Sequence, residues 1–137
     1  LLLVDHAQAS FLTNHPLIDR RPLTPGIHGL SNGGFDVPWP KTVRVQDALA
    51  RWLSAPHRDC APLFAALRDE TPAIDAANPD HGPESRFSPV FIANPVYGTR
   101  CSTLIAIDRA GRGFAIERSF DPDGRVSGEA RVEFRWP

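Results

Sequence analysis

The sequence predicts a single α+β domain in which two central helices pack against mostly antiparallel strands. Three observations support this class: short apolar runs near the N-terminus, a middle segment with helical periodicity, and three β-rich runs separated by tight turns in the last third. The chain has 137 residues, of which 42% are hydrophobic and 23% charged. This length and composition are those of one globular domain with its own core.

The N-terminal quarter of the chain is predicted to form short strands. Residues 1–4 and 9–13 are apolar runs on either side of a polar turn, which indicates a β-hairpin. Residues 14–24 contain prolines and arginines and are interpreted as a connector. A Pro-Gly turn signal follows, and residues 27–32 are predicted to form another strand.

The middle of the chain changes to helical periodicity. Pro40 suits the first turn of a helix, and Pro56 lies just past the predicted end. A second helix is predicted over residues 59–68, and residues 71–85, with three prolines, are predicted to be an exposed loop. The apolar positions of the first helix recur on one side: Val45, Ala48, Leu49, Trp52 and Leu53.

The last third of the chain is predicted to form an antiparallel meander. Its strands cover residues 99–108, 113–120 and 130–136, and a shorter strand is expected over residues 89–93. Apolar and charged residues alternate in the last strand. This alternation predicts a sheet with one face on the core and one face in water.

Composition excludes several classes of function. The net charge of −1 gives no overall attraction to nucleic acid, and no apolar run reaches the roughly 18 residues that a membrane span needs.

Two cysteines, Cys60 and Cys101, are too few for a disulfide framework and indicate reduced thiols in a cytoplasmic protein. The histidines and cysteines show no paired ligand spacing, so we predict neither a metal site nor a cofactor. Abundant arginine, alanine and proline indicate a bacterial genome, and the lack of methionine indicates a fragment of a longer protein.

The stretch "NPVYGTRCST" contains two candidate chemical groups. A guanidinium beside Cys101 would favour a thiolate, but strand alternation places Arg100 on the opposite face, which favours an inert thiol that points into the core. Arg100 in a half-buried strand needs an anionic or carbonyl partner. This partner is either Glu117 on the next strand or a carboxylate or phosphate of a substrate, and the sequence leaves both open.

The stretch "PGIHGLSNGGFDVPWPK" is unusually rich in turn-forming residues and also contains His, Asn, Asp and Trp. Asn32 precedes two glycines, so its amide is placed to project into a cleft that a ligand can approach closely. Alternatively, Asn32 forms an Asx-turn and Trp39 anchors the first helix to the sheet. Asp36 accepts a hydrogen bond from either a backbone N–H or Lys41.

Three blocks of the sequence resemble the C-terminal half of the NRDE family, the family of the transport and Golgi organization proteins. The blocks are "HGLSNGGFDVPWPK", "SPVFIANPVYGTRCSTLIAID" and "FAIERSFDPDG", and they span residues 27–124. The resemblance implies a four-layer αββα sandwich similar to N-terminal-nucleophile (Ntn) hydrolases, of which residues 1–137 would be the C-terminal half. It also implies an upstream Met-Cys start and an Asn-Arg-Asp-Glu signature, which this sequence does not contain.

The resemblance implies one of two functions. The first is an Ntn-type amidohydrolase or acyltransferase whose upstream cysteine attacks an amide or thioester, while Asn32 stabilises the oxyanion and Arg100 places the substrate. The second is a non-catalytic binding or trafficking protein for a hydrophobic cargo such as haem or an acyl-CoA lipid, with His28 as a haem contact. A third interpretation is that the blocks only stabilise the sheets. The family pattern carries over to these candidate substrate-binding residues: His28, Ser31, Asp36, Trp39, Lys41, Tyr97 and Thr99.

Overall fold

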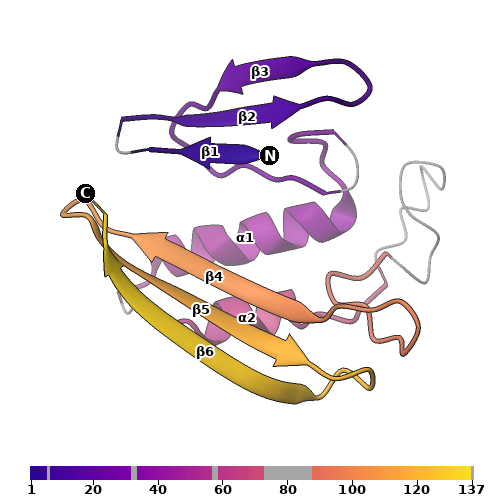
Figure 1. The fold of residues 1–137 in the computed structure, drawn as a ribbon. Coiled ribbons are helices and arrows are strands. Elements are labelled where there is room, and N and C mark those ends of the chain that lie inside the picture. Colours follow the sequence, from indigo (N-terminus) through magenta and orange to yellow (C-terminus); the bar gives the residue numbers. More distant parts are fainter. Residues whose placement is uncertain (6, 32–33, 57–58, 73–87, 137) are drawn as a thin grey trace.

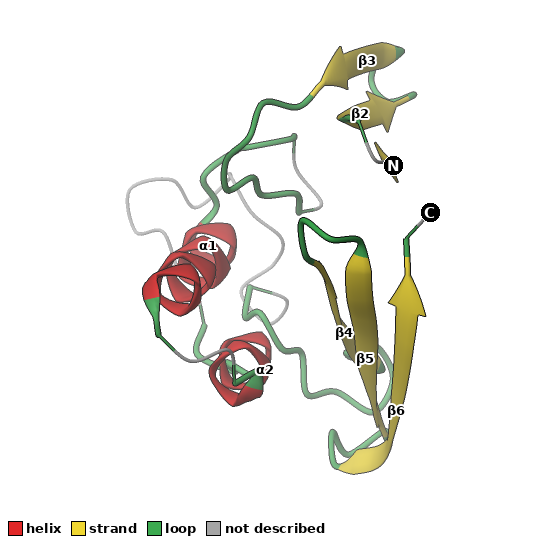
Figure 2. Cartoon of the chain, turned by 90° about the vertical axis from the view of Figure 1, so that its left-hand side faces the viewer, coloured by secondary structure: helices red, strands yellow, loops and turns green. Residues whose placement is uncertain are grey.

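The computed structural model describes residues 1–5, 7–31, 34–56, 59–72 and 88–136. These residues form two helices and two three-stranded antiparallel sheets (Figure 1), which confirms the α+β class. Both helices lie on one side of the C-terminal sheet, and the N-terminal sheet lies beyond the end of that sheet (Figure 2). The four-layer arrangement that the resemblance implies is not established by these elements.

The N-terminal sheet has the order β1-β2-β3, with β1 at Leu2–Val4, β2 at Ala9–Thr13 and β3 at Asp19–Pro22. The predicted hairpin of β1 and β2 is confirmed. The interpretation of residues 14–24 as a connector was wrong, because β3 pairs with β2 in the register Leu12↔Arg20. A polar strand with a terminal proline is suited to the edge of a sheet, where one row of backbone groups faces water.

The strand predicted over residues 27–32 is not found in the described part, residues 27–31, and Asn32 lies outside the described residues. The backbone groups of Gly29 bond to Asp36 instead. Asp36 Oδ1 accepts the Gly29 N–H at 2.7 Å, and the Gly29 carbonyl accepts the Asp36 N–H at 2.7 Å. This pair closes a loop, so these groups are not available for a strand ladder.

The two helices are α1, Pro40–Ser54, and α2, Ala61–Leu67. Helix α1 begins with proline in its first turn and ends before Ala55, whose backbone is extended, as the sequence predicts. Helix α2 is shorter than the predicted range 59–68, with Cys60 and Arg68 as its flanking residues, and Asp59 Oδ1 accepts the Ala61 N–H at 3.0 Å just before it. The Trp52 indole donates a hydrogen bond of 2.6 Å to the Asp59 carbonyl and so joins the end of α1 to the start of α2.

The C-terminal sheet has the order β4-β5-β6, with β4 at Cys101–Ile107, β5 at Arg112–Phe120 and β6 at Val126–Arg135. The predicted meander is confirmed. The strand predicted over residues 89–93 was wrong, since this segment is irregular. Its Phe91 N–H donates to the Asp69 carbonyl at 2.9 Å, after α2, instead of to a neighbouring strand.

The two faces of the C-terminal sheet are covered unequally. Ile116 and Phe120 face the helices and are 6% and 7% exposed. Ile105 and Val132 lie on the other face, which we call the open face, and are 67% and 59% exposed. The period of the last strand was predicted correctly, but its apolar side faces away from the helices.

The core between α2 and the C-terminal sheet is centred on Phe91, which is fully buried. Its ring meets Phe120 edge-on, with centroids 4.8 Å apart. The Arg68 guanidinium lies 3.7 Å from the centroid of the Phe91 ring, a cation–π geometry. Phe91 therefore connects the irregular segment, the end of α2 and the end of β5.

We expect Phe91→Ala to lower the free energy of unfolding by about 3–5 kcal/mol, the usual cost of removing a buried aromatic ring. Urea denaturation followed by circular dichroism measures this change. The matched control is Val96→Ala, because Val96 is 92% exposed and its loss should change stability by less than about 0.5 kcal/mol. Equal effects of the two substitutions would contradict the assignment of Phe91 to the core.

Candidate functional site

A largely apolar pocket of about 430 Å³ lies between the N-terminal sheet and the loop that follows it. Its apolar walls include Phe11, Leu17, Leu30 and Phe35, and Ser31 is among its polar lining residues. Small-molecule sites usually have volumes of roughly 300–1,000 Å³ and a lining of this kind. The pocket therefore has the size and chemistry to hold a small organic ligand.

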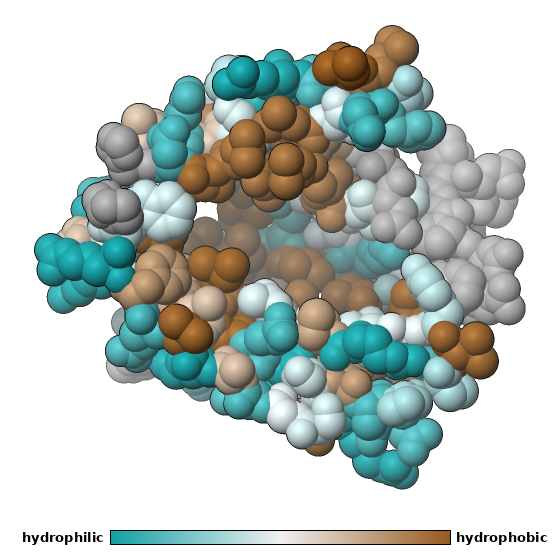
Figure 3. Space-filling view, viewed as in Figure 1, coloured by the Kyte–Doolittle hydropathy of each residue, from teal (hydrophilic) through white to brown (hydrophobic). Residues whose placement is uncertain are grey.

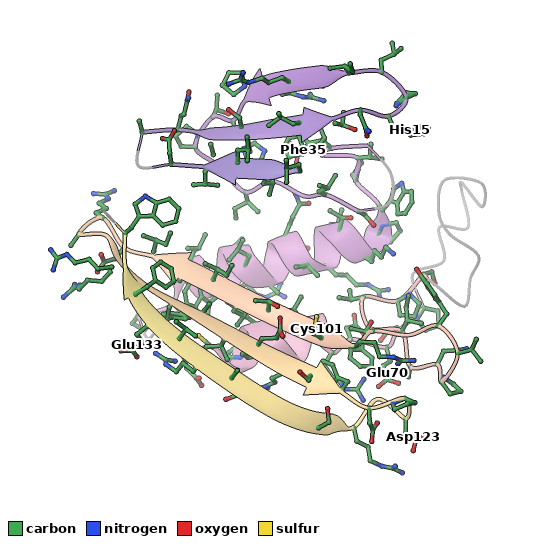
Figure 4. All side chains as sticks on the ribbon, in the orientation of Figure 1. His15, Phe35, Glu70, Cys101, Asp123 and Glu133 are labelled. Atoms are coloured by element: carbon green, nitrogen blue, oxygen red, sulfur yellow. The ribbon has the colours of Figure 1, made fainter. Side chains whose placement is uncertain are left out.

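An aromatic pair and one arginine form one wall of this pocket. The rings of Phe11 and Phe35 are stacked with centroids 4.6 Å apart. The Arg21 guanidinium lies 5.5 Å and 5.4 Å from these two centroids and pairs with Asp19 at 3.0 Å. The pocket thus combines an apolar body with one ion-paired end formed by Arg21 and Asp19 (Figure 4 labels Phe35 and His15 on this side of the molecule).

His28 and Asp36 form an ion pair behind the wall. The His28 Nδ1 lies 2.7 Å from Asp36 Oδ2, and Nε2 lies 2.8 Å from the Thr24 carbonyl oxygen. Both neighbours are acceptors, and this arrangement favours the imidazolium, in which both ring nitrogens donate. The hydrogen bond to Asp36 raises the pKa of His28, and the bond to the Thr24 carbonyl adds to this.

Asp36 is held as a carboxylate in a left-handed backbone conformation with φ of 58°. The Gly29 N–H lowers the pKa of Asp36 most, and the bond from His28 lowers it further. The His28 ring also stacks on Phe35, with centroids 5.3 Å apart. The ion pair therefore fixes the loop and positions Phe35 in the pocket wall.

Of the two partners that the sequence left open for Asp36, the backbone N–H is found: it is that of Gly29, and His28 is a further partner. The Lys41 ammonium lies 5.6 Å from the Trp39 ring centroid, and burial lowers its pKa. Trp39 directly precedes α1. Trp39 and Lys41 thus lie at the start of the helix.

The second block of candidate residues lies near the start of β4. Arg100 Nη2 donates to the carbonyls of Asn94 and Pro95 at 3.1 Å and 3.0 Å, so its observed partners are loop carbonyls. Glu117, the alternative partner, accepts the Thr103 hydroxyl at 2.9 Å. The Thr99 hydroxyl oxygen accepts the Ile92 N–H at 3.0 Å. These bonds hold the irregular segment against the strand.

The structure brings only part of the predicted site together. Ser31 lines the pocket, and His28 and Asp36 brace its wall from behind. Asn32 lies outside the described residues. The pocket lining does not include Trp39, Lys41, Tyr97, Thr99 or Arg100.

Sequence reasoning missed the apolar wall. Phe11 and Phe35 are 24 positions apart, and only the folded loop stacks their rings. Arg21 was not predicted as a site residue because its segment was interpreted as a connector. Its position in β3 places the guanidinium over the Phe11 and Phe35 rings. The aromatic residue directly after two glycines was the one local signal that pointed to this wall.

Fold and pocket together define an α+β protein with a site of small-molecule size. Residues 1–122 match the family model described as Transport and Golgi organisation 2. The chain belongs to the Transport and Golgi organisation 2 family, which confirms the resemblance of the three blocks.

Several curated proteins are similar to this chain. The Transport and Golgi organization protein 2 homologs of Bos taurus and Homo sapiens are 36% and 35% identical over 116 and 112 residues, or 74% and 71% of this chain. The Mus musculus homolog is 30% identical over 114 residues, or 71% of the chain. The matches cover 42%, 40% and 40% of these relatives, so the chain spans about two fifths of their length. All three are animal proteins, which gives the predicted bacterial source no support.

Neither helix in the described part of the chain is long and apolar enough to cross a membrane. Cys60 and Cys101 are both free thiols, and neither lines the pocket. Cys101 is exposed at the start of β4 (labelled in Figure 4), not buried as the sequence predicts. Its exposure follows from its position on the open face of the sheet.

The ion pair predicts a specific pH dependence of stability. His28 has a raised pKa, so its contribution is fully present below its ordinary value of 6.5 and is lost as pH rises through the folded-state pKa. Asp36 has a lowered pKa, so its contribution is present above 3.8 and is lost as pH falls through the folded-state pKa. We expect Asp36→Asn to lower the free energy of unfolding more at pH 5 than at pH 9.

Urea denaturation at the two pH values measures this difference. Asp123→Asn is the matched control, because Asp123 is an exposed carboxylate that pairs with Arg125 in a turn far from His28 in the sequence. Its effect should be small at both pH values. A loss of stability in Asp36→Asn that is the same at pH 5 and pH 9 would contradict the charged His28 ring.

Proposed function

We propose that this protein binds a small hydrophobic cargo in the pocket of the N-terminal sheet. The observation that carries this proposal is the apolar lining, in which Phe11, Leu17, Leu30 and Phe35 surround about 430 Å³ of space. Acyl compounds, amides with an apolar body, and haem all match this chemistry. Family membership supports the proposal, since the pocket lies beside the first of the three family blocks.

The polar groups of the pocket give the cargo an orientation. Arg21 sits at the aromatic wall, where its guanidinium can bind a carboxylate or carbonyl oxygen of the cargo. The apolar body of the cargo then packs against Leu30 and Phe35. Because His28 and Asp36 hold the loop in place, little ordering is required when the cargo binds. His28 coordinates haem iron only if it gives up a bond to Thr24 or Asp36.

Leu30→Gln tests the cargo site, and Leu53→Gln is its matched control. Both leucines are 47% exposed, but only Leu30 lines the pocket. We expect Leu30→Gln to weaken binding about tenfold, because an amide buried against an apolar cargo costs on the order of 1–3 kcal/mol. Haem is titrated by absorbance and N-octanoylglycine by calorimetry. The proposal fails if neither probe binds, or if both substitutions weaken binding equally.

A second proposal is that the same pocket serves an Ntn-type amidohydrolase or acyltransferase. Ser31 and Gly34 both line the pocket, and they flank the two positions that include Asn32. The family resemblance gives Asn32 the role of oxyanion donor and Arg100 that of placing the substrate. Arg100 would then exchange its bonds to the Asn94 and Pro95 carbonyls for bonds to the substrate.

The nucleophile of this second proposal is a cysteine outside residues 1–137, within an αββα sandwich. The open face supports the sandwich, because Ile105 and Val132 on it are 67% and 59% exposed. A second sheet laid on this face would remove these side chains from water, which is strongly favourable for apolar surface. Residues 1–137 alone are expected to show no turnover.

Asn32→Ala tests the catalytic proposal in a polypeptide that includes the implied cysteine. We expect kcat for an amide or thioester substrate to fall about 100- to 1,000-fold, the usual effect of losing one oxyanion donor. Asn14→Ala is the control, because Asn14 is an exposed amide outside the family blocks. Turnover that survives replacement of the cysteine would exclude the Ntn mechanism but leave cargo binding intact.

A further inference from the structure

A second cavity, of about 760 Å³, lies where the end of β1 approaches the tip of the C-terminal sheet. It shares no lining residue with the pocket described above. Figure 3 shows the surface hollowed between the two sheets. Val4, Ile107 and Trp136 supply apolar walls, and the charged lining residues are Asp5, Asp108, Arg109 and Arg135.

The β4–β5 turn at this cavity is braced by Asp108. Its Oδ2 accepts a hydrogen bond from Arg112 Nε at 2.8 Å and forms an ion pair with Nη2 at 2.8 Å. Its Oδ1 accepts the backbone N–H groups of Ala110 and Arg112 at 2.8 Å and 3.0 Å. Asp108 and Arg112 therefore neutralise each other. The turn that carries Arg109 is held in one conformation by these bonds.

Two arginines, Arg109 and Arg135, line the cavity, and Asp108 does not balance their charge because it pairs with Arg112. Among the described residues, neither Arg109 nor Arg135 forms an ion pair with a carboxylate. Arg135 lies directly opposite Arg112 in the β5–β6 ladder, a like-charge pair that is unfavourable. Asp5, on the far wall, accepts the N–H groups of Ala7 and Gln8 and so caps the β1–β2 turn. Because Asp108 already neutralises Arg112, the charge left for an anion to compensate is that of Arg109 and Arg135.

Trp136 is fixed beside the same turn. Its backbone N–H donates to the Gly111 carbonyl at 2.6 Å. Gly111 has a φ of 74°, and a Cβ there would lie 2.8 Å from the Trp136 carbonyl oxygen, so only glycine allows this close approach. Trp136, directly after β6, is thus bonded to the same β4–β5 turn that carries Arg109.

We propose that this cavity binds a small organic anion, in which a phosphate or carboxylate is carried on a flat apolar body. The guanidinium groups of Arg109 and Arg135 bind the anionic group, since planar forks match both phosphate and carboxylate oxygens. Trp136 and Ile107 contact the apolar body. This site is separate from the cargo pocket, so it stands whether or not the proposed function is correct.

Calorimetry at low ionic strength with four probes tests the site: 1-naphthyl phosphate, 1-naphthoate, inorganic phosphate and neutral 1-naphthol. We expect the first or second probe to bind at least about tenfold more tightly than the other two, because only these combine both features. Which of the two binds more tightly identifies the anionic group. The proposal is overturned if 1-naphthol or inorganic phosphate binds as well as both naphthyl anions.

Arg109→Gln and Arg135→Gln should each weaken binding of the preferred naphthyl anion about tenfold, as expected for losing one charge-assisted contact. Arg131→Gln is the control, because Arg131 lies on the same strand but pairs with Glu133 at 3.0 Å. Trp136→Phe should retain more affinity than Trp136→Leu. Equal weakening by all three arginine substitutions would show general charge attraction and overturn the site. Leu30→Gln should leave this binding unchanged.

Discussion

The contact between Arg68 and Phe91 is the constraint on which the arrangement of the helices and the C-terminal sheet depends. The guanidinium covers the buried ring at 3.7 Å and donates through Nη2 to the Gly124 carbonyl at 2.9 Å, in the β5–β6 turn. The next residue, Asp69, accepts the Phe91 N–H and pairs with Arg44 of α1 at 3.3 Å. Two consecutive residues after α2 thus connect both helices, the irregular segment and the sheet. A charged group is tolerated here because it pairs with Glu70 at 2.7 Å, while the Phe91 and Phe120 rings and the Gly124 carbonyl lie around the rest of the guanidinium.

Helix α1 also determines the position of the cargo pocket. Thr42 of α1 is buried, and a Cβ at Gly29 would collide with its side chain, so the loop backbone packs directly on the helix. Asp36 then holds Gly29 through two hydrogen bonds, and His28 stacks on Phe35. The position of the pocket wall therefore follows from the position of α1. This makes the unusual composition of the first family block a requirement of packing as well as a candidate for chemistry.

The sequence predicted those elements whose signals are local. The helical spacing from Val45 to Leu53 and the tight turns of the meander correspond to α1 and to β4-β5-β6. Where a partner outside the segment itself decides its structure, prediction failed. Residues 27–31 have strand-like composition, but the Gly29 N–H donates to the Asp36 side chain and not to a neighbouring strand. The polar β3 forms a strand because it pairs with the edge of β2. The same limit applies to the site. Ser31, His28 and Asp36 were found by motif, but the Phe11–Phe35 wall requires the tertiary fold.

Strand alternation showed which residues of β6 share a face, but not which face would be covered. The charged side of β6 faces the helices but stays exposed to solvent, because β6 is an edge strand. Its charges pair locally: Glu129 with Arg118 of β5 at 2.6 Å, and Glu133 with Arg131 at 3.0 Å. The Arg118 guanidinium also covers the Phe64 ring of α2 at 3.9 Å, so one arginine joins the charged edge to the core. The apolar side of β6 is thereby directed to the open face. A pattern of period two fixes the faces of a strand, and only the packing of neighbouring layers decides which of them is the interior.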